Sequence, residues 1–171
     1  MNFNWKNDGD LSAKSDRDYL SDLIQSLTHD LHTDSSSREI LFKRGNAYLD
    51  SGLYEHAIKD YTELMEKNEE DCRVWNNRGI CYRALMAPEA AISDFDKAIS
   101  LNKLYRDAYN NRGMALSDLE KYGDAIKDFS KSIEIDNSYL YAYNNRAMTF
   151  WALGKKEEAF ADYEKVKQLF T

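Results

Sequence analysis

The sequence predicts an all-α protein built from a repeated pair of helices. Its 171 residues include one proline and seven glycines, too few turn formers for a sandwich or barrel of short strands. A hydrophobic fraction of 43% is sufficient for one sizeable core. An Asn-Asn-Arg motif recurs every 34 residues, starting at Asn76, Asn110 and Asn144. We therefore expect one helical repeat domain, with no second domain beside it.

The first expected element is an amphipathic helix that follows a polar, irregular segment over residues 1–14. Ser15 can cap this helix, and four leucines form one apolar stripe along it: Leu20, Leu23, Leu27 and Leu31. Counting back 34 residues places it where the second helix of a preceding repeat would lie. We assign residues 1–37 to a polar leader and this capping helix. A dimerisation helix and a self-inhibitory segment lying along the repeats are the alternatives.

Four copies of a 34-residue unit fill the rest of the chain, over 38–71, 72–105, 106–139 and 140–171, the last stopping two residues short. The eighth residue of each copy is small: Gly45, Gly79, Gly113 and Ala147. The twenty-fourth is aromatic: Tyr61, Phe95, Phe129 and Tyr163. Apolar residues at the fourth, eighth and eleventh places share one helical stripe, and those at the twentieth, twenty-fourth and twenty-seventh share another. Each copy therefore predicts two antiparallel helices whose backbones approach closely at the small residues.

A pair of charged columns accompanies these apolar stripes. The seventh residue of each copy is arginine: Arg44, Arg78, Arg112 and Arg146. The twenty-third is aspartate: Asp60, Asp94, Asp128 and Asp162. A guanidinium beside the core is costly unless a carboxylate accepts its hydrogen bonds. We therefore expect ion pairs between helices, within a copy or between neighbouring copies.

The four copies resemble the tetratricopeptide repeat family, whose large-x-x-large-Gly-x-x-Tyr … Ala-x-x-x-Phe signature they match over residues 38–171. Two departures are present: arginine precedes the small residue in every copy, and the usual proline near the end of a copy is replaced by Glu69, Lys103 and Asn137. The resemblance implies a right-handed α-solenoid that binds peptides in its concave groove. It also implies a non-enzymatic interaction module such as an adaptor, scaffold or chaperone.

The face opposite the core stripe of each first helix is the candidate binding site. Its residues fall at the second, sixth, ninth and thirteenth places of a copy, and stacking of the copies would align them into one concave wall. A carboxamide both donates and accepts, so it can bind a peptide backbone whatever the side chains are. Isoleucine and methionine add adaptable apolar contact. The candidate peptide-binding residues are Lys43, Asn46, Arg73, Asn77, Ile80, Asn111, Met114, Asn145 and Met148.

Asn76, Asn110 and Asn144 are expected at the edge of the same wall. An asparagine ladder in this groove is similar to the one in the repeat domain of O-linked N-acetylglucosamine transferases. The alternative interpretation is that the asparagines recur only because the copies duplicated recently.

The sequence can also be tested against the family members that bind the Glu-Glu-Val-Asp tails of heat-shock chaperones. Those proteins hold two carboxylates with a clamp of cations and asparagines. Asn46 and Asn77 match the asparagine places, but Phe42, Asp107 and Asn111 stand where the clamp has cations. Such a tail is therefore not the expected partner.

Several classes of function are disfavoured by composition and motifs. The formal charge is −7, and the chain has no cluster of Lys and Arg that would bind nucleic acid or an anionic membrane. It carries no phosphate-binding loop, metal-ligand spacing or activated nucleophile, and His29 with His32 would make only half a metal site. Cys72 and Cys81 are too far apart along one helix for a disulfide. We expect a cytoplasmic protein that is not an enzyme and needs no cofactor.

Two further hypotheses remain open at this level. The chain could self-assemble, for example as a homodimer, through its N-terminal helix or through a C-terminal face containing Phe160, Val166 and Phe170. It could also be a dedicated secretion chaperone or an immunity-type inhibitor of one partner, because small acidic proteins of this kind resemble the translocator chaperones of type III secretion.

Overall fold

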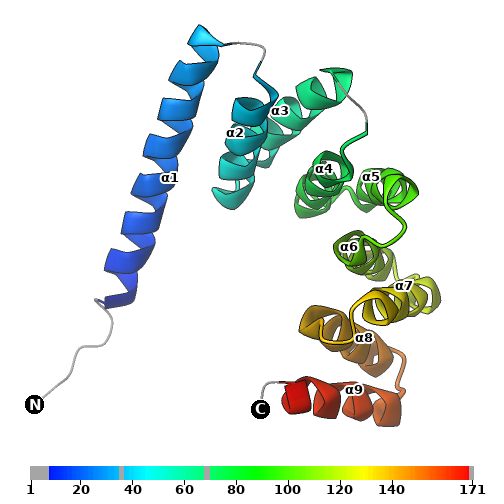
Figure 1. Ribbon diagram of the computed structural model, residues 1–171. Coiled ribbons are helices and arrows are strands. Elements are labelled where there is room, and N and C mark those ends of the chain that lie inside the picture. The colour runs from blue at the N-terminus through cyan, green and yellow to red at the C-terminus, as the bar shows by residue number, and fades with distance from the viewer. Residues whose placement is uncertain (1–7, 35–36, 68–69, 170–171) are drawn as a thin grey trace, which may run out of the picture. The chain divides into compact units, whose positions relative to one another are not determined.

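The computed structural model describes residues 8–34, 37–67 and 70–169 (Figure 1). Over these residues the chain forms helices and no strand, so the predicted all-α fold is confirmed. The chain divides into two compact units, residues 1–69 and 70–171. Unit 1 contains α1 (Asp8–Thr33), α2 (Arg38–Asp50) and α3 (Tyr54–Lys67). Unit 2 contains α4 (Cys72–Ala84), α5 (Pro88–Leu101), α6 (Arg106–Asp118), α7 (Tyr122–Ile135), α8 (Leu140–Ala152) and α9 (Lys156–Leu169).

Helix α1 is longer than the sequence predicts. It begins at Asp8, so Ser15 lies inside the helix and does not cap it, and residues 8–14 are helical and not irregular. Leucine, alanine and lysine within 8–15 are good helix formers, and they extend the helix past the capping signal. The expectation for residues 1–7 lies outside the described part of the chain.

In unit 1, α1 packs against α2. Leu27 and Leu31 are buried on α1, and Leu41 is buried on α2. The Nη1 of Arg44 donates to Thr28 Oγ1 over 3.4 Å. The C-terminal half of the apolar stripe of α1 is therefore covered within its own unit, whereas Leu20 and Leu23 are half-buried.

Each helix pair is closed by a small residue packed against an aromatic ring. A Cβ at Gly79 would lie 2.7 Å from Phe95 Cε1, and one at Gly113 would lie 2.7 Å from Phe129 Cε1. Both rings are almost completely buried. Glycine is required at these places because the ring of the partner helix occupies the space that a methyl group would need.

The predicted ion pairs are confirmed, and all four connect the two helices of one copy. In each pair, the Nε and Nη2 of the arginine donate to the two carboxylate oxygens of the aspartate sixteen residues later. All eight donor–acceptor distances are 2.7–2.8 Å. The pairs are Arg44–Asp60, Arg78–Asp94, Arg112–Asp128 and Arg146–Asp162.

The turn between the two helices of a copy has the same backbone in all four copies. One residue in each turn has a positive φ: 72° at Gly52, 58° at Met86, 58° at Glu120 and 73° at Gly154. This conformation is free of strain for glycine but costs energy for residues with a Cβ. The two middle copies therefore contain a strained turn.

The two cysteines lie on α4, and both are free thiols. Cys81 is completely buried in unit 2, and this burial raises the pKa of its thiol to about 12. No described helix has the length and apolar character needed to cross a membrane.

Candidate functional site

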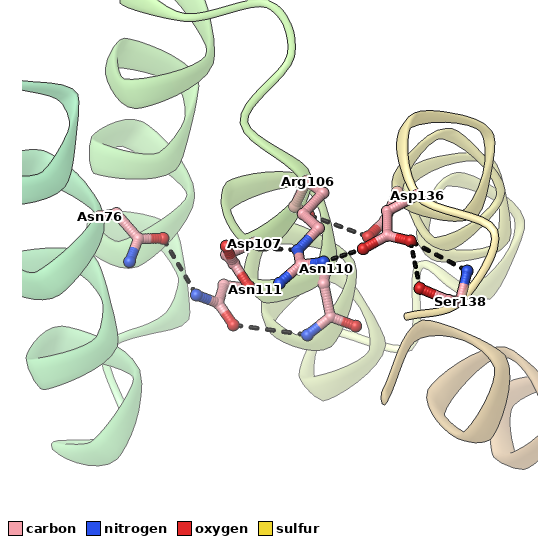
Figure 2. Close-up of polar contacts among 8 residues, drawn as sticks. Asn76, Arg106, Asp107, Asn110, Asn111, Asp136 and Ser138 are labelled. Carbon is pink, nitrogen blue, oxygen red and sulfur yellow. Dashed lines mark hydrogen bonds and ion pairs between the residues drawn. The ribbon is translucent and has the colours of Figure 1, made fainter. Parts of the chain in front are cut away.

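The central feature of unit 2 is a chain of hydrogen-bonded asparagines across α4, α6 and α8, which we call the asparagine ladder. The Nδ2 of Asn145 donates to Asn110 Oδ1 over 2.9 Å, and Asn110 Nδ2 lies 3.5 Å from Asn111 Oδ1. The Nδ2 of Asn111 donates to Asn76 Oδ1 over 3.0 Å, and Asn76 Nδ2 donates to Asn77 Oδ1 over 3.1 Å. Figure 2 shows the contacts of Asn111 with Asn76 and with Asn110. In both hydrogen bonds between helices, the donor therefore belongs to the later copy and the acceptor to the copy before it.

The ladder contains two kinds of asparagine. Asn76 and Asn110 are 4% and 3% exposed, whereas Asn77, Asn111 and Asn145 are half-buried. The expectation that Asn76 and Asn110 lie at the edge of an open wall is therefore wrong, because each is covered where successive copies meet. Their carboxamides are satisfied there by asparagines of the same and the next copy.

Two of the half-buried asparagines, Asn111 and Asn145, keep hydrogen-bonding capacity beyond the ladder. A carboxamide has two N–H groups and two acceptor lone pairs. Asn111 uses one N–H for Asn76 and one lone pair for Asn110. Asn145 uses one N–H for Asn110. The ladder therefore fixes the orientation of the Asn111 and Asn145 amides while leaving each of these two a donor and an acceptor.

An apolar pocket of about 220 Å³ lies beside the ladder, between α6 and α8. Its residues are Arg83, Met114, Ser117, Asp118, Phe129, Asn145, Met148 and Thr149. Met114 is half-buried and Met148 is 58% exposed. Ile80, the third member of the predicted apolar row, packs instead against the core residues of α5 and α6. The pocket therefore uses two of the three predicted apolar residues.

Two polar contacts at one end of this pocket were not predicted from the sequence. Arg83 of α4 pairs with Asp118 of α6, with Nε 2.6 Å from Oδ2. Ser117 Oγ lies 3.3 Å from Thr149 Oγ1 of α8. The twelfth place of a copy differs in every repeat, so no recurring residue type gave a signal there.

The remaining predicted site residues make local contacts. Lys43 of α2 pairs with Glu39 over 2.6 Å, and Arg73 of α4 pairs with Asp71 over 2.8 Å. Asn46 of α2 accepts a hydrogen bond from the hydroxyl of Tyr61 over 2.7 Å. In unit 1, Lys43 and Asn46 line a pocket of about 260 Å³ together with α1. In unit 2, the structure brings together the ladder, Met114 and Met148.

The N-terminus of α6 carries the charged part of unit 2 next to the ladder. Arg106 contacts Asp136 and lies 3.7 Å from Asp107, and Asp136 accepts from Ser138 (Figure 2). The guanidinium of Arg106 stacks 4.4 Å from the ring centre of Tyr139. Burial and a hydrogen bond to Asp107 raise the pKa of Tyr139 above its usual range. These contacts connect α6 to the α7–α8 segment.

We call the surface formed by Asn77, Asn111, Met114, Asn145 and Met148 the ladder face. Three helices present it: α4, α6 and α8 follow one another on one side of unit 2 (Figure 1). Within the described residues, no three His, Cys, Asp or Glu side chains lie together in a way that could hold a metal ion. The chemistry available at this face is hydrogen bonding and apolar contact.

Comparison with solved structures gives neighbours over most of the chain. The structure of MamA is 25% identical, with 85% of each chain covered and a TM-score of 0.77. The first repeat domain of Spaghetti (RPAP3), solved with the HSP90 peptide SRMEEVD, is 32% identical; 68% of this chain and 93% of that chain are covered, with a TM-score of 0.66. The same domain of the human RPAP3 protein, solved by NMR, is 32% identical with 70% and 94% covered and a TM-score of 0.67.

The family of the chain is identified by comparison with family models. No curated protein matches the chain significantly. Two models, both described as tetratricopeptide repeat, match residues 39–71, 72–103, 107–139 and 140–170. The matched ranges correspond to the four copies of the 34-residue unit. The chain therefore belongs to the tetratricopeptide repeat family.

Proposed function

We propose that the ladder face of unit 2 binds an extended peptide segment of a partner protein. The observation that carries this proposal is the asparagine ladder, which holds Asn77, Asn111 and Asn145 in one row with a common orientation. Amides oriented in this way need little reordering when a peptide binds, so less conformational entropy is lost. The activity is protein recognition by a non-enzymatic module.

The spacing of the row suits an extended chain. Packed helices lie about 8–10 Å apart, and an extended peptide advances roughly 3.3 Å per residue. One step of the ladder therefore spans about three peptide residues. Asn111 and Asn145 would then contact backbone groups at intervals of one ladder step, whatever side chains the peptide carries.

The pocket between α6 and α8 adds selectivity for one side chain. Its volume of about 220 Å³ is enough for a leucine, methionine or phenylalanine side chain. Met114 and Met148 can adapt to any of these because the thioether chain is flexible and polarisable. The preferred ligand is a peptide with one large apolar residue next to backbone held by Asn145.

The relatives support the class of ligand but not its sequence. RPAP3 was solved with the peptide SRMEEVD, which shows a peptide ligand in a relative 32% identical to this chain. Asp107 and Asp118 stand on α6 close to the ladder face. Asp118 is already paired with Arg83, and Asp107 stands where the clamp for acidic tails has a cation, so we propose a neutral or mixed-charge apolar segment instead.

We also propose that residues 1–37 form a leader and capping helix, and that residues 38–171 form the repeat region. Within unit 1, Thr28 accepts from the Nη1 of Arg44. In unit 2, Ser130 of α7 accepts from the Nη1 of Arg146 in the same way. The equivalence supports α1 as a substitute for the second helix of a preceding repeat.

Peptide display against the full chain tests the proposal. Peptides selected on the wild-type protein are measured against a triple variant with Asn77, Asn111 and Asn145 each replaced by alanine. At about 1 kcal/mol for each lost hydrogen bond, binding should weaken at least about 30-fold. The matched control replaces the exposed Asn102 and Asn137 and should bind normally. Unchanged affinity in the triple variant, with intact helical circular dichroism, would sink the proposal.

A further inference from the structure

Each junction between consecutive copies in unit 2 is made by the same contacts. The amide of the sixth residue of a copy donates to the fifth residue of the copy before it: Asn111 to Asn76, and Asn145 to Asn110. The Nη1 of the seventh residue reaches the second helix of the preceding copy: Arg112 contacts Asp96, and Arg146 donates to Ser130 over 2.8 Å. At both junctions, the first helix of the later copy, which we call the incoming helix, therefore contacts the preceding copy through an adjacent Asn-Arg pair.

Small residues complete the contact surface of each incoming helix. On α6, Ala108 packs with Ala98 and Ile99, and Ala115 packs with Phe95 of the preceding copy. Ala108 lies three residues before Asn111, and Ala115 lies three residues after Arg112. These places are spaced i, i+3, i+4 and i+7, so they form one stripe along α6. The same stripe on α8 is Ala142, Asn145, Arg146 and Thr149.

The last copy has the residues that would accept the first helix of a following copy. Among the described residues, no helix packs on them. Asn144 takes the place of Asn76 and Asn110, and it is exposed. Glu164 takes the place of Asp96 and Ser130, and its side chain is 66% exposed.

The apolar part of the receiving surface is exposed as well. Tyr163 is 36% exposed, whereas its counterparts Phe95 and Phe129 are 0% and 1% exposed. Trp151 and Phe160, whose rings are in edge-to-face contact at 5.8 Å, extend the surface across α8 and α9. We call this surface, made of Asn144, Trp151, Phe160, Tyr163 and Glu164, the terminal face.

We propose that the terminal face binds one amphipathic helix of a partner protein with the pattern small-x-x-Asn-Arg-x-x-small. The partner's Asn amide donates to Asn144 Oδ1, and its Arg guanidinium pairs with Glu164. The two small residues lie over Tyr163 and Val166, as Ala115 and Ala108 lie over the corresponding residues of α5. This second binding site is separate from the ladder face and does not depend on a peptide bound there.

The contacts favour a partner helix over a second copy of this chain. The helices α6 and α8 carry the required stripe, but they already use it inside unit 2, where Ala108, Ala115 and Ala142 are completely buried. A folded second copy cannot offer either stripe without breaking its own junctions. Glu164 lies 3.9 Å from Lys167 Nζ and is largely exposed, so its carboxylate can still accept the shorter, charge-assisted hydrogen bonds of an arginine.

A synthetic peptide of residues 105–119, which carries the stripe of α6, is the probe for this face. It is titrated into the isotope-labelled full chain, and binding is followed by NMR. An isolated helix of this length is marginal in water, so we expect a Kd of about 0.1–1 mM. Shifts are expected at Asn144, Tyr163 and Glu164 and not at the ladder face.

A charge exchange separates this proposal from nonspecific contact. The substitution Glu164→Lys in the protein should weaken peptide binding at least about 10-fold. A peptide that carries Arg112→Glu should restore binding to this variant. Glu134→Lys on α7 is the matched control and should bind the original peptide normally. Circular dichroism verifies that each variant is folded.

Three results would overturn the proposal. The first is the absence of shifts up to about 2 mM peptide. The second is a shift pattern confined to the ladder face, which would assign the peptide to the site of the proposed function. The third is concentration-dependent shifts at the terminal face without peptide, which would assign that face to self-association.

Discussion

Arg112 and Asp128 form a bidentate ion pair between α6 and α7, with Nε and Nη2 each 2.7 Å from a carboxylate oxygen. The hydrogen bond to Asp128 raises the pKa of the guanidinium above its usual range, so Arg112 is charged at neutral pH. Asp128 is buried. The pair therefore combines a desolvated carboxylate with a fixed cation. Burial of the Asp128 carboxylate is costly unless the Arg112 guanidinium remains bound to it.

Removal of one member should be far more costly than removal of both. Arg112→Ala leaves the buried Asp128 without its cation, and we expect the free energy of unfolding to fall by about 3 kcal/mol. The double variant Arg112→Met, Asp128→Leu should regain part of that loss. Urea denaturation followed by circular dichroism gives both values. Equal losses in the single and double variants would contradict this account of the pair.

The contact between Gly113 and Phe129 predicts that alanine destabilises the protein at Gly113 but not at Gly123. Gly113→Ala places a methyl group 2.7 Å from Phe129 Cε1 and should lower the free energy of unfolding by about 2 kcal/mol. Gly123→Ala, on α7, meets no atom within 4 Å and should raise it by about 0.5 kcal/mol through helix propensity. Thermal denaturation of the two variants measures the difference. Similar effects at the two positions would show that the ring does not restrict Gly113.

The positive φ of Met86 predicts a stabilising substitution. Met86 has a φ of 58° at the place where the first and last copies have Gly52 and Gly154. Met86→Gly removes the Cβ strain of the left-handed conformation and should stabilise the protein by about 1 kcal/mol. Met86→Ala keeps the Cβ and serves as the control. Stabilisation by alanine as large as by glycine would mean that loss of the exposed methionine, and not relief of strain, is responsible.

Burial of the Cys81 thiol predicts a pH dependence of stability. The pKa of the thiol is raised from 9.0 to about 12 in the folded protein, so the unfolded chain releases this proton first. The contribution of the protonated thiol to the free energy of unfolding is fully present below pH 9. It is lost as the pH rises toward 12, by up to about 1.4 kcal/mol per pH unit.

Cys81→Ala is the test, because alanine already occupies the equivalent places Ala47 and Ala115. The variant should show a shallower fall of the free energy of unfolding between pH 9 and 11. Urea denaturation across that range compares the two proteins. An identical slope would mean that the thiol remains protonated in both states or ionises equally in both.

Much of the fold follows from the sequence because each copy repeats its local signals. The turn at Gly154 and the small residue at Ala147 recur at fixed places, so the helix pairs and their core stripes could be predicted. The Arg–Asp pairs could also be predicted, since two complementary columns flank the same core. The start of α1 could not, because the capping signal at Ser15 is weaker than the helix formers before it.

The candidate site was predicted less completely. Asn77, Asn111 and Asn145 were identified from their place on each first helix, and the structure connects them through hydrogen bonds. Asn76 and Asn110 were placed at an open edge, yet they are buried where the copies meet. A recurring asparagine one place before another was the available signal, but it does not tell whether a helix lies over it.

The sequence by itself determined the repeat, the helix pairs, the charged columns and the polar row of each first helix. Periodicity gives the direction of a side chain around its own helix axis, and these features depend only on that direction. Only the tertiary structure decided that Asn110 receives the amide of Asn145, that Arg83 reaches Asp118, and that Glu164 stands uncovered among the described residues. Those relationships depend on which helix lies in that direction and at what distance, which packing between the copies sets.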